Sequence, residues 1–453
     1  MFDYMTKVET MENRTKKTTS LYSAVVVFIL SFFVYNDFNI RMLYGFVLMG
    51  LVLVFFMLTS NKTILADRIG IAYLLMALVI DVFAFLPYSR LEYDAVSLII
   101  SLNISVVFVI LAKPNSDEII RSFKWITVVG VLLAFYVIIV AFLPQFYYDF
   151  VSKFISQESD RVVRLMLADG YGVAIGGSTV LLLYIVVLTI FILMNYFLLY
   201  KLKLKTKVLV LSLFFISLGA MILSNRKSEI LMVIVVVILS FFAKYSFTTR
   251  KNKRNRIKIL LVLTLIVTVL VIWLASMGYL NRYIFFFRNI ISNLSGSGRQ
   301  IDVSSGRLEL WAKAFELFKE HPIFGIGWGR FVDHVDMYNY GKDALINNVH
   351  NNYLQLLCEV GIIGAIAILT PMFYIFNKTR KLANQLKAIK DESIKTLRLI
   401  VNVSLNFQIF MLLVSVIDPI WYKTVFWWFY GIVIILSCYG NEQFKVVKAR
   451  GLK

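Results

Sequence analysis

The sequence predicts an all-α fold, a polytopic membrane helix bundle of about twelve transmembrane helices that forms a single membrane domain over residues 1–453. Three observations support this prediction. Hydrophobic residues make up 59% of the chain and charged residues only 16%, too few to cover the surface of a soluble protein of this length. The apolar residues gather into runs that suit a bilayer, and the lysines and arginines between these runs are distributed unevenly.

The apolar runs give the positions of the predicted spans. A helix needs roughly 20 mainly apolar residues to cross the hydrocarbon core of a bilayer. The candidate spans cover residues 21–36, 42–59, 69–87, 95–112, 125–143, 177–199, 208–224, 229–243, 259–277, 353–376, 399–416 and 424–439.

The basic residues predict the orientation of the bundle, because cytoplasmic loops carry an excess of lysine and arginine. If the N-terminus is cytoplasmic, seven segments face the cytoplasm, and they hold 31 of the 47 basic residues. These segments are 1–20, 60–68, 112–124, 200–207, 244–258, 377–398 and 440–453. We therefore expect both termini in the cytoplasm. Because the net charge of +20 is spread over short loops, it favours a membrane surface over nucleic acid as the partner.

Two predicted outer loops, 144–176 and 278–352, are longer than a connection requires. Loops of this kind commonly carry function on a helical scaffold. The alternative is a poorly ordered insertion, but the aromatic residues in both loops argue against disorder. We expect the larger loop to contain short amphipathic helices and to hold the active site.

Within the larger loop, Arg307 precedes the segment LELWAKAFELFKE. Four apolar residues recur there at the spacing of one helix face: Trp311, Ala314, Phe315 and Phe318. Ser304 or Ser305 can cap this helix, which places Arg307 in its first turn, beside unpaired amide hydrogens that suit a phosphate. The alternative is a solvated arginine on an interfacial helix.

All three histidines, His321, His334 and His350, lie in the larger loop. If the helix that enters the membrane begins near His350, Gly361 and Gly364 lie about 20° and about 40° to either side of it around the helix axis. The imidazole would then lie above a glycine face on which another helix packs closely. An imidazole held there is a candidate general base. A zinc site is the alternative, but the ligand spacing does not support one, and we expect no metal.

Four carboxyl groups lie in or near the predicted spans, where ionisable groups are candidates for function. Glu229, Glu359 and Asp418 are near the outer ends, and Asp81 is inside the third span. Glu359 lies about 180° from His350 on the same predicted helix, which favours a structural ion pair for it. Asp81 is expected to pair inside the bundle in the same way.

Two segments, SSGRLELWAKAFELFKEHPIFGIGWGRF and VHNNYLQLLCEVGIIG, resemble the O-antigen ligase and Wzy-type polysaccharide polymerase family. The family's motif is His, then Asn, Ser or Gln, then nine residues and Gly-x-x-Gly. It is matched by His350, Asn351, Gly361 and Gly364. The resemblance is strongest over residues 300–370.

Further arginines have counterparts in that family. Arg161 and Arg164 in the first loop are similar to its arginine-containing outer loop, and Arg161 has the family's Arg-x10-Gly spacing. Arg226 lies in a short turn similar to the family's Ser-Arg turn, although Asn225 intervenes here. Arg307 lacks the Arg-x10-Gly spacing, because position 318 is Phe.

The resemblance implies a metal-independent, inverting membrane glycosyltransferase without a cofactor. It would polymerise undecaprenyl diphosphate-linked repeat units into a capsule, exopolysaccharide or O-antigen at the outer face of the bacterial cytoplasmic membrane. His350 would accept the proton of the attacking hydroxyl, and four arginines would stabilise the diphosphate: Arg161, Arg164, Arg226 and Arg307. The expected partners are the lipid-linked glycan, the bilayer, and a flippase and a chain-length regulator of the same pathway, with no nucleic acid.

Other functions compete with polymerisation. A ligase that transfers finished glycan to a lipid A core has the same motifs, and we favour the polymerase because it is the broader group. A lipid-linked oligosaccharide flippase or other transporter also suits twelve spans. Against it stand the lack of an internal repeat and the scarcity of proline inside the spans. A membrane scaffold without enzymatic activity is the last alternative.

Overall fold

A computed structural model describes residues 67–90, 93–155, 157–168, 172–173, 179–224, 227–245, 307–335, 348–389 and 391–450. Within these residues all regular secondary structure is helical, as predicted. Nine of the predicted spans coincide with helices: α4 (Arg68–Ala84), α5 (Tyr93–Leu111), α6 (Ser116–Phe142), α9 (Thr179–Leu199), α10 (Leu204–Leu223), α11 (Lys227–Tyr245), α15 (Asn352–Ala388), α16 (Lys395–Val414) and α17 (Thr424–Ala449). The other three predicted spans, 21–36, 42–59 and 259–277, lie outside the described residues.

Four helical segments in the described part of the chain are long and apolar enough to cross a membrane. They are Ser116–Phe142, Leu204–Leu223, Asn352–Ala388 and Glu392–Val414. Shorter apolar helices lie at Leu98–Leu111, Tyr184–Leu199 and Ser228–Phe241. The total of twelve spans and the cytoplasmic position of the termini stay predictions.

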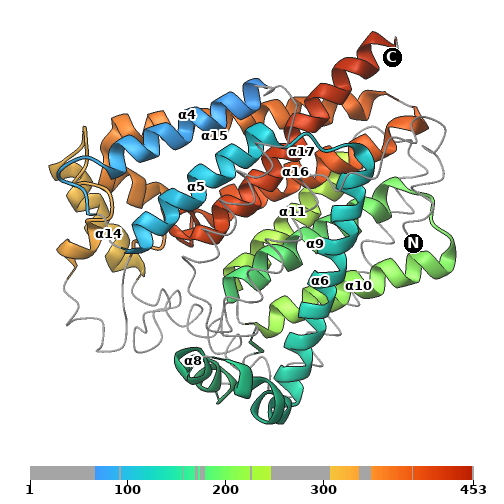
Figure 1. The fold of residues 1–453 in the computed structure, drawn as a ribbon, viewed down its shortest axis with the longest axis horizontal. Helices are drawn as coiled ribbons and strands as arrows, with labels where there is room; N and C mark the ends of the chain where they lie inside the picture. Colours follow the sequence, from blue (N-terminus) through green and yellow to red (C-terminus); the bar gives the residue numbers. More distant parts are fainter. Residues whose placement is uncertain are drawn as a thin grey trace, which may run out of the picture.

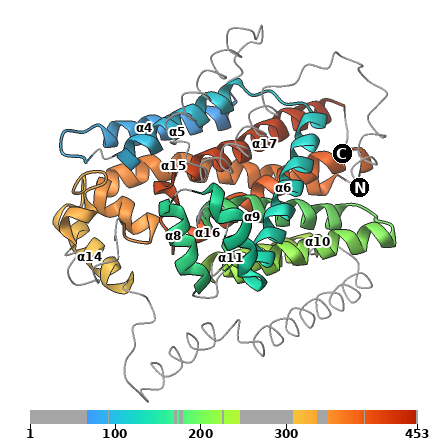
Figure 2. The same ribbon diagram turned by 60° about the horizontal axis from the view of Figure 1, so that its bottom comes forward.

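The helices pack in two groups that meet at α16. Figure 1 shows α4, α5, α15, α16 and α17 lying side by side, with α15 against α4 and α17 against α5. The second group consists of α6, α9 and α10, which pack on one another, and α16 also contacts α9 and α11. Figure 2 shows the same arrangement from another side.

Small and polar side chains allow these helices to approach closely. A Cβ atom on Gly130 of α6 would lie 3.0 Å from the Cβ of Thr189 on α9. The Thr189 hydroxyl donates to the carbonyl of Ile126, 3.1 Å away on α6. Inside the other group, the side-chain nitrogen of Gln408 on α16 lies within hydrogen-bonding distance of three hydroxyl groups. These belong to Thr379 on α15, Ser404 on α16 and Ser437 on α17. Contacts of this kind are the usual links between helices in a membrane.

The described parts of both long loops contain short helices. In the 144–176 loop these are α7 (Pro144–Phe146), the π-helical turn η1 (Tyr147–Val151), the 3-10 turn η2 (Ser152–Phe154) and α8 (Gln157–Ala168). The larger loop contains α14 (Arg307–Glu320) and η4 (Phe331–His334). Figure 1 shows α14 beside the beginning of α15.

The helix α14 confirms the predicted amphipathic helix but corrects its buried face. The buried residues of α14 are Leu310, Ala314 and Leu317. Phe315, which was predicted to belong to the buried stripe, is 47% exposed. The periodicity of apolar residues is a poor guide here, because in a membrane protein an apolar side chain gains from facing lipid as well as from facing the core. The predicted caps, Ser304 and Ser305, lie outside the described residues.

Candidate functional site

The helix that follows His350 begins at Asn352, close to the predicted start of the span, and it is interrupted. Asn351 is its N-cap, and its side-chain oxygen accepts from the amides of Tyr353 at 3.0 Å and Leu354 at 3.1 Å. Gly361 has φ 65° and ψ −172°, so α15 has a break at this position. The angles predicted from a continuous helix starting at His350 are therefore wrong.

The two motif glycines serve different contacts. A Cβ atom on Gly361 would collide with the backbone of Ile323 and Phe324 in the loop after α14. At Gly364 a Cβ atom would lie 2.8 Å from the Phe83 ring of α4. Gly364 thus allows a helix to pack closely, as predicted, whereas Gly361 makes room for a loop.

The loop after α14 fits into the break of α15 through an exchange of hydrogen bonds. In a continuous helix the carbonyls of Cys358 and Glu359 would accept from the amides four residues later. Here they accept from Ile326 at 3.0 Å and from Gly327 at 2.9 Å. The displaced amides of Ile362 and Ile363 donate instead to the carbonyls of Pro322 at 2.9 Å and Ile323 at 3.3 Å. This exchange fixes the loop on the helix without leaving these backbone groups unsatisfied.

The glycine-rich turn after α14 follows a path that suits few other residues. Gly325, Gly327 and Gly329 have φ values of 72°, 110° and 73°. A Cβ atom on Gly327 would come within 2.5 Å of the Tyr88 carbonyl oxygen. Glycine accepts such φ values without the steric cost that a side chain brings.

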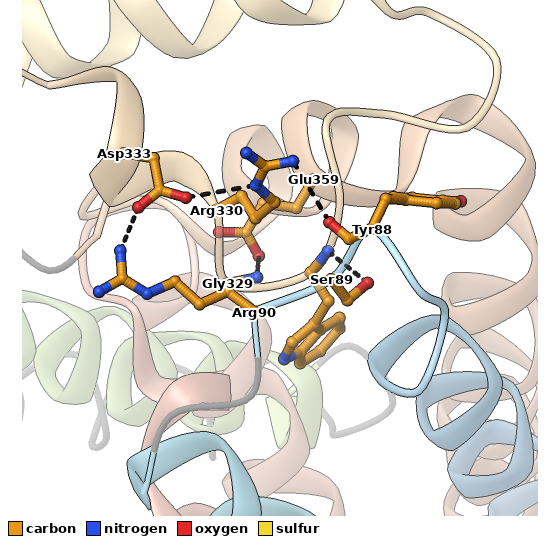
Figure 3. Close-up of polar contacts among 8 residues, drawn as sticks. Tyr88, Ser89, Arg90, Gly329, Arg330, Asp333 and Glu359 are labelled. Carbon is orange, nitrogen blue, oxygen red and sulfur yellow. Dashed lines mark hydrogen bonds and ion pairs between the residues drawn. The ribbon is translucent and has the colours of Figure 1, made fainter.

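Glu359 lies beneath this turn, and its carboxyl group is almost completely buried (1% exposed). One oxygen accepts from the hydroxyl of Tyr422 at 2.7 Å and from the amide of Gly329 at 3.0 Å, and the other accepts from the side-chain amide of Gln355 at 3.1 Å. Figure 3 shows Glu359 directed at Gly329. These neutral donors replace the ion pair that the sequence favoured for Glu359.

The same turn is bound to the connection between α4 and α5. The amide of Arg90 donates to the Trp328 carbonyl at 2.9 Å, and the amide of Trp328 donates to the Ser89 hydroxyl at 3.2 Å. Arg90 and Arg330 both pair with the carboxylate of Asp333 (Figure 3). The loop that leads toward the histidine motif is therefore held from two sides, by α15 and by the α4–α5 connection.

His350 itself has a left-handed backbone, with φ 55°. Few residues other than glycine adopt this conformation, although histidine does so more often than most. Its amide donates to the side-chain oxygen of Asn348 at 3.1 Å, and its Nδ1 atom is buried with no hydrogen-bond partner among the described residues. Burial lowers the pKa of His350, the charges of Arg307 and Lys423 lower it further, and Asp418 opposes them. A neutral imidazole suits a general base.

The connection between α16 and α17 packs against the residues that follow His350. The amide of Asn352 donates to the Ser415 carbonyl at 2.8 Å, and the Asn352 side chain accepts from the amide of Trp421 at 3.3 Å. The Tyr353 hydroxyl donates to the Leu412 carbonyl at 2.9 Å. We call the assembly of residues 307–335, 348–363 and 412–423 the His350 junction.

The His350 junction contains a lysine that the sequence analysis missed. Lys423 pairs with Asp418, with Nζ 2.7 Å from Oδ2. A single lysine between two apolar segments looks like an ordinary loop residue. Its position five residues after an acidic residue at the predicted outer edge was the signal that could have identified it.

The predicted arginines are not all in one place. Arg307 is the first residue of α14 and acts on His350, as described above. Arg161 and Arg164 lie exposed on α8, where Arg164 pairs with Asp160 at 2.7 Å and covers the Tyr148 ring at 5.0 Å. The described contacts of Arg164 are thus local to its own loop.

The 144–176 loop also reaches the end of α10. The amide of Gly172 donates to the carbonyl of Leu223 at 2.9 Å. The turn with Arg226 begins directly after this helix, but Arg226 lies outside the described residues.

The other predicted carboxyl groups lie inside the bundle or at its edge. Both oxygens of Asp81 accept from the side-chain amide of Asn103 on α5, at 3.1 and 3.0 Å. Asp81 therefore has a partner inside the bundle, but this partner is a neutral amide rather than the expected cation. Glu229 is 2% exposed and accepts from the Ser228 hydroxyl at 2.9 Å.

The segment of the chain that contains the break in α15 matches a known protein family. Residues 211–369 match the family described as O-antigen ligase. This region belongs to the O-antigen ligase family. It contains the break in α15, the glycine-rich turn and the whole histidine motif, together with Arg307. The apolar helices and the match to this family indicate a membrane protein.

The chain is also similar to an uncharacterized protein of Haemophilus influenzae. The two are 30% identical over 151 residues, which cover 31% of this chain and 36% of the relative. The match thus spans about a third of the relative's length and extends the O-antigen ligase assignment no further.

Proposed function

We propose that the protein polymerises oligosaccharide repeat units carried on undecaprenyl diphosphate into a surface polysaccharide. The reaction takes place at the outer face of the bacterial cytoplasmic membrane. The observation that carries the proposal is the His350 junction, in which a half-buried imidazole lies in the field of Arg307 within a region of the O-antigen ligase family. A base next to a cation is what glycosyl transfer from a diphosphate requires.

The proposed chemistry is an inverting displacement without a metal. A hydroxyl group of the acceptor glycan attacks the anomeric carbon of the sugar on the carrier. The new glycosidic bond forms as the bond from that carbon to the diphosphate oxygen breaks, and the electron pair leaves with the diphosphate. His350 takes the proton of the attacking hydroxyl, and the guanidinium of Arg307 stabilises the charge on the leaving group.

The arginines outside the junction have a different proposed role. Arg161 and Arg164 are exposed on α8, and we assign them, with Arg226, to the glycan or to the diphosphate as it approaches. Long-range attraction of an anion requires neither burial nor a fixed geometry.

The test uses the purified full-length protein with a synthetic undecaprenyl diphosphate repeat unit. A ladder of longer products on a gel is expected for the wild type and its loss for His350→Ala. His321→Ala is the matched control, because this histidine lies in the same loop with an exposed side chain. A ladder that persists in His350→Ala would remove this histidine from the mechanism.

The same assay separates the competing functions. The matching family is described as O-antigen ligase, which favours ligation as the second candidate, so a lipid A core acceptor is offered in a parallel reaction. A single transfer to that acceptor without a ladder would identify a ligase. Movement of the carrier-linked unit across vesicles without any new glycosidic bond would identify a flippase.

A further inference from the structure

The connection between α16 and α17 brings a second cation to the His350 junction. The Nζ atom of Lys423 lies 2.7 Å from Oδ2 of Asp418. The side chain of Lys423 is 27% exposed, whereas that of Asp418 is 9% exposed. The ammonium group can therefore meet a ligand while the carboxylate holds it from the inner side.

The position of Lys423 is fixed by its neighbours. Its amide donates to the carbonyl of Ile420 at 3.1 Å, and its carbonyl accepts from the amide of Phe426 at 3.0 Å, in the first turn of α17. Two residues earlier, Trp421 is bound to Asn352, which lies two residues after His350. The backbone of Lys423 is therefore held in place before a ligand binds, and the ion pair with Asp418 orients its side chain. Little conformational freedom is then lost on binding.

The charges around His350 do not cancel. The groups that act on its imidazole are Arg307 from α14 and the pair of Asp418 and Lys423 from the α16–α17 connection. Among the described residues, two cations and one anion leave a surplus of one positive charge beside the imidazole. A surplus of this kind favours a ligand with several negative charges, and a diphosphate is such a ligand.

We propose that Lys423, oriented by Asp418, binds the diphosphate of the carrier together with Arg307 beside His350. This assignment rests on the proposed function for the identity of the ligand. The carboxylate directs the ammonium toward the site, and the diphosphate takes up its remaining donors. The competing explanation is that the pair only closes the connection between α16 and α17, as a local ion pair.

Substitutions of the two partners distinguish these explanations. If the pair only closes the connection between α16 and α17, Lys423→Met and Asp418→Asn break the same interaction. The two substitutions should then change the Kd for diphosphate equally. If Lys423 binds the diphosphate, Lys423→Met removes the ligand contact, whereas Asp418→Asn loses the orientation of the ammonium but also removes a negative charge that opposes anion binding. Lys423→Arg keeps the charge and should retain binding. The control is Lys313→Met, which breaks an exposed ion pair with Glu316 on α14.

The measurement is equilibrium binding of inorganic diphosphate to the full chain in detergent, beside the KM and kcat of glycan transfer. We expect Lys423→Met to raise Kd at least about tenfold, and Asp418→Asn and Lys423→Arg to stay within about threefold of the wild type. Equal effects of Lys423→Met and Asp418→Asn, or no effect of Lys423→Met, would overturn the proposal. So would a wild type that does not bind inorganic diphosphate. If Lys423→Met does not fold, Lys423→Gln takes its place.

The outcomes also separate this inference from the proposed function. Binding that depends on Lys423 in a wild type that forms no glycosidic bond would keep the anion site and reject the polymerase. A wild type that builds the ladder while Lys423→Met binds diphosphate normally would keep the polymerase and reject this role of Lys423.

Discussion

The two loops that contain predicted site arginines hold their charged residues in different ways. In the His350 junction, three separate parts of the chain meet, and backbone hydrogen bonds join the loop after α14 to the break in α15. Arg307 there is half-buried, and it acts on a half-buried imidazole. In the 144–176 loop, Arg161 and Arg164 are exposed on one short helix, and the partner of Arg164 is one turn away on the same helix.

This difference determines which chemical role suits each loop. A group that takes a proton must be held within hydrogen-bonding distance of its substrate, which requires a rigid environment. A cation that attracts a charged substrate acts over several ångströms and tolerates an exposed position. Substitutions of buried groups in the His350 junction should therefore cost stability and activity together, and substitutions on α8 should leave stability unchanged.

The largest expected effect belongs to Gly361→Ala. Its φ of 65° and ψ of −172° suit glycine alone, and a Cβ atom would collide with the backbone of Ile323. Both effects oppose the docking of the loop, and together they should destabilise the protein by about 3 kcal/mol. The checks are a thermal melt in detergent and the glycan ladder, both of which should show a clear loss.

Gly219→Ala is the matched control for this substitution. Gly219 lies inside α10, and a Cβ atom there would meet nothing within 4 Å. Alanine should be neutral or slightly stabilising at such a site, because it has the higher helix propensity. Equal melting temperatures for the two variants would show that the break in α15 is not a structural requirement.

Glu359→Gln should have the next largest effect. Tyr422, Gly329 and Gln355 all donate hydrogen bonds to Glu359, and glutamine would present a donor where one acceptor oxygen was. At least one buried donor then loses its partner, at a cost of about 2 kcal/mol. Tyr422→Phe removes one donor and keeps the ring that stacks on Trp328, so it should cost about 1 kcal/mol. Denaturation of both variants tests this order, and the reverse order would contradict the assigned role of Glu359.

The positions of the helices follow closely from the sequence, and the exceptions have physical reasons. The predicted span 353–376 corresponds to α15, which continues to Ala388, and the span 424–439 corresponds to α17, which continues to Ala449. Hydropathy detects only the part of a helix that lies in the hydrocarbon core. The polar extensions are helical as well, but their composition does not distinguish them from a loop.

The motif spacing identified His350 and its glycines, but not their geometry. Local periodicity assumes a continuous helix, whereas the break at Gly361 depends on a loop about 35 residues earlier in the chain that supplies and accepts hydrogen bonds. Lys423 was missed for a similar reason, because its proximity to His350 comes from packing between α15 and the α16–α17 connection. Arg307 was placed correctly in the first turn of α14, since a helix start depends on local signals.

A smaller effect is expected in the pH profile of the reaction. His350 acts as a base when neutral, so kcat/KM should rise with pH through its pKa, which burial, Arg307 and Lys423 lower from 6.5. Arg307→Gln removes a positive charge, which favours the imidazolium, raises the pKa and moves the acid limb to higher pH. Asp418→Asn should move it to lower pH. Shifts of about 0.5 units are expected, and shifts of the same sign in both variants would contradict this arrangement of charges.

The smallest effect is expected for Arg164→Gln on α8. Its ion pair with Asp160 is exposed, and exposed pairs of this kind change the free energy of unfolding by less than about 0.5 kcal/mol. The melting temperature should therefore match that of the wild type. If Arg164 attracts the anionic carrier, KM should rise modestly at low salt and the difference should vanish at high salt, because salt screens exposed charges. A fall in kcat that persists at high salt would instead place Arg164 beside the reacting atoms, and the contrast between the two loops would then disappear.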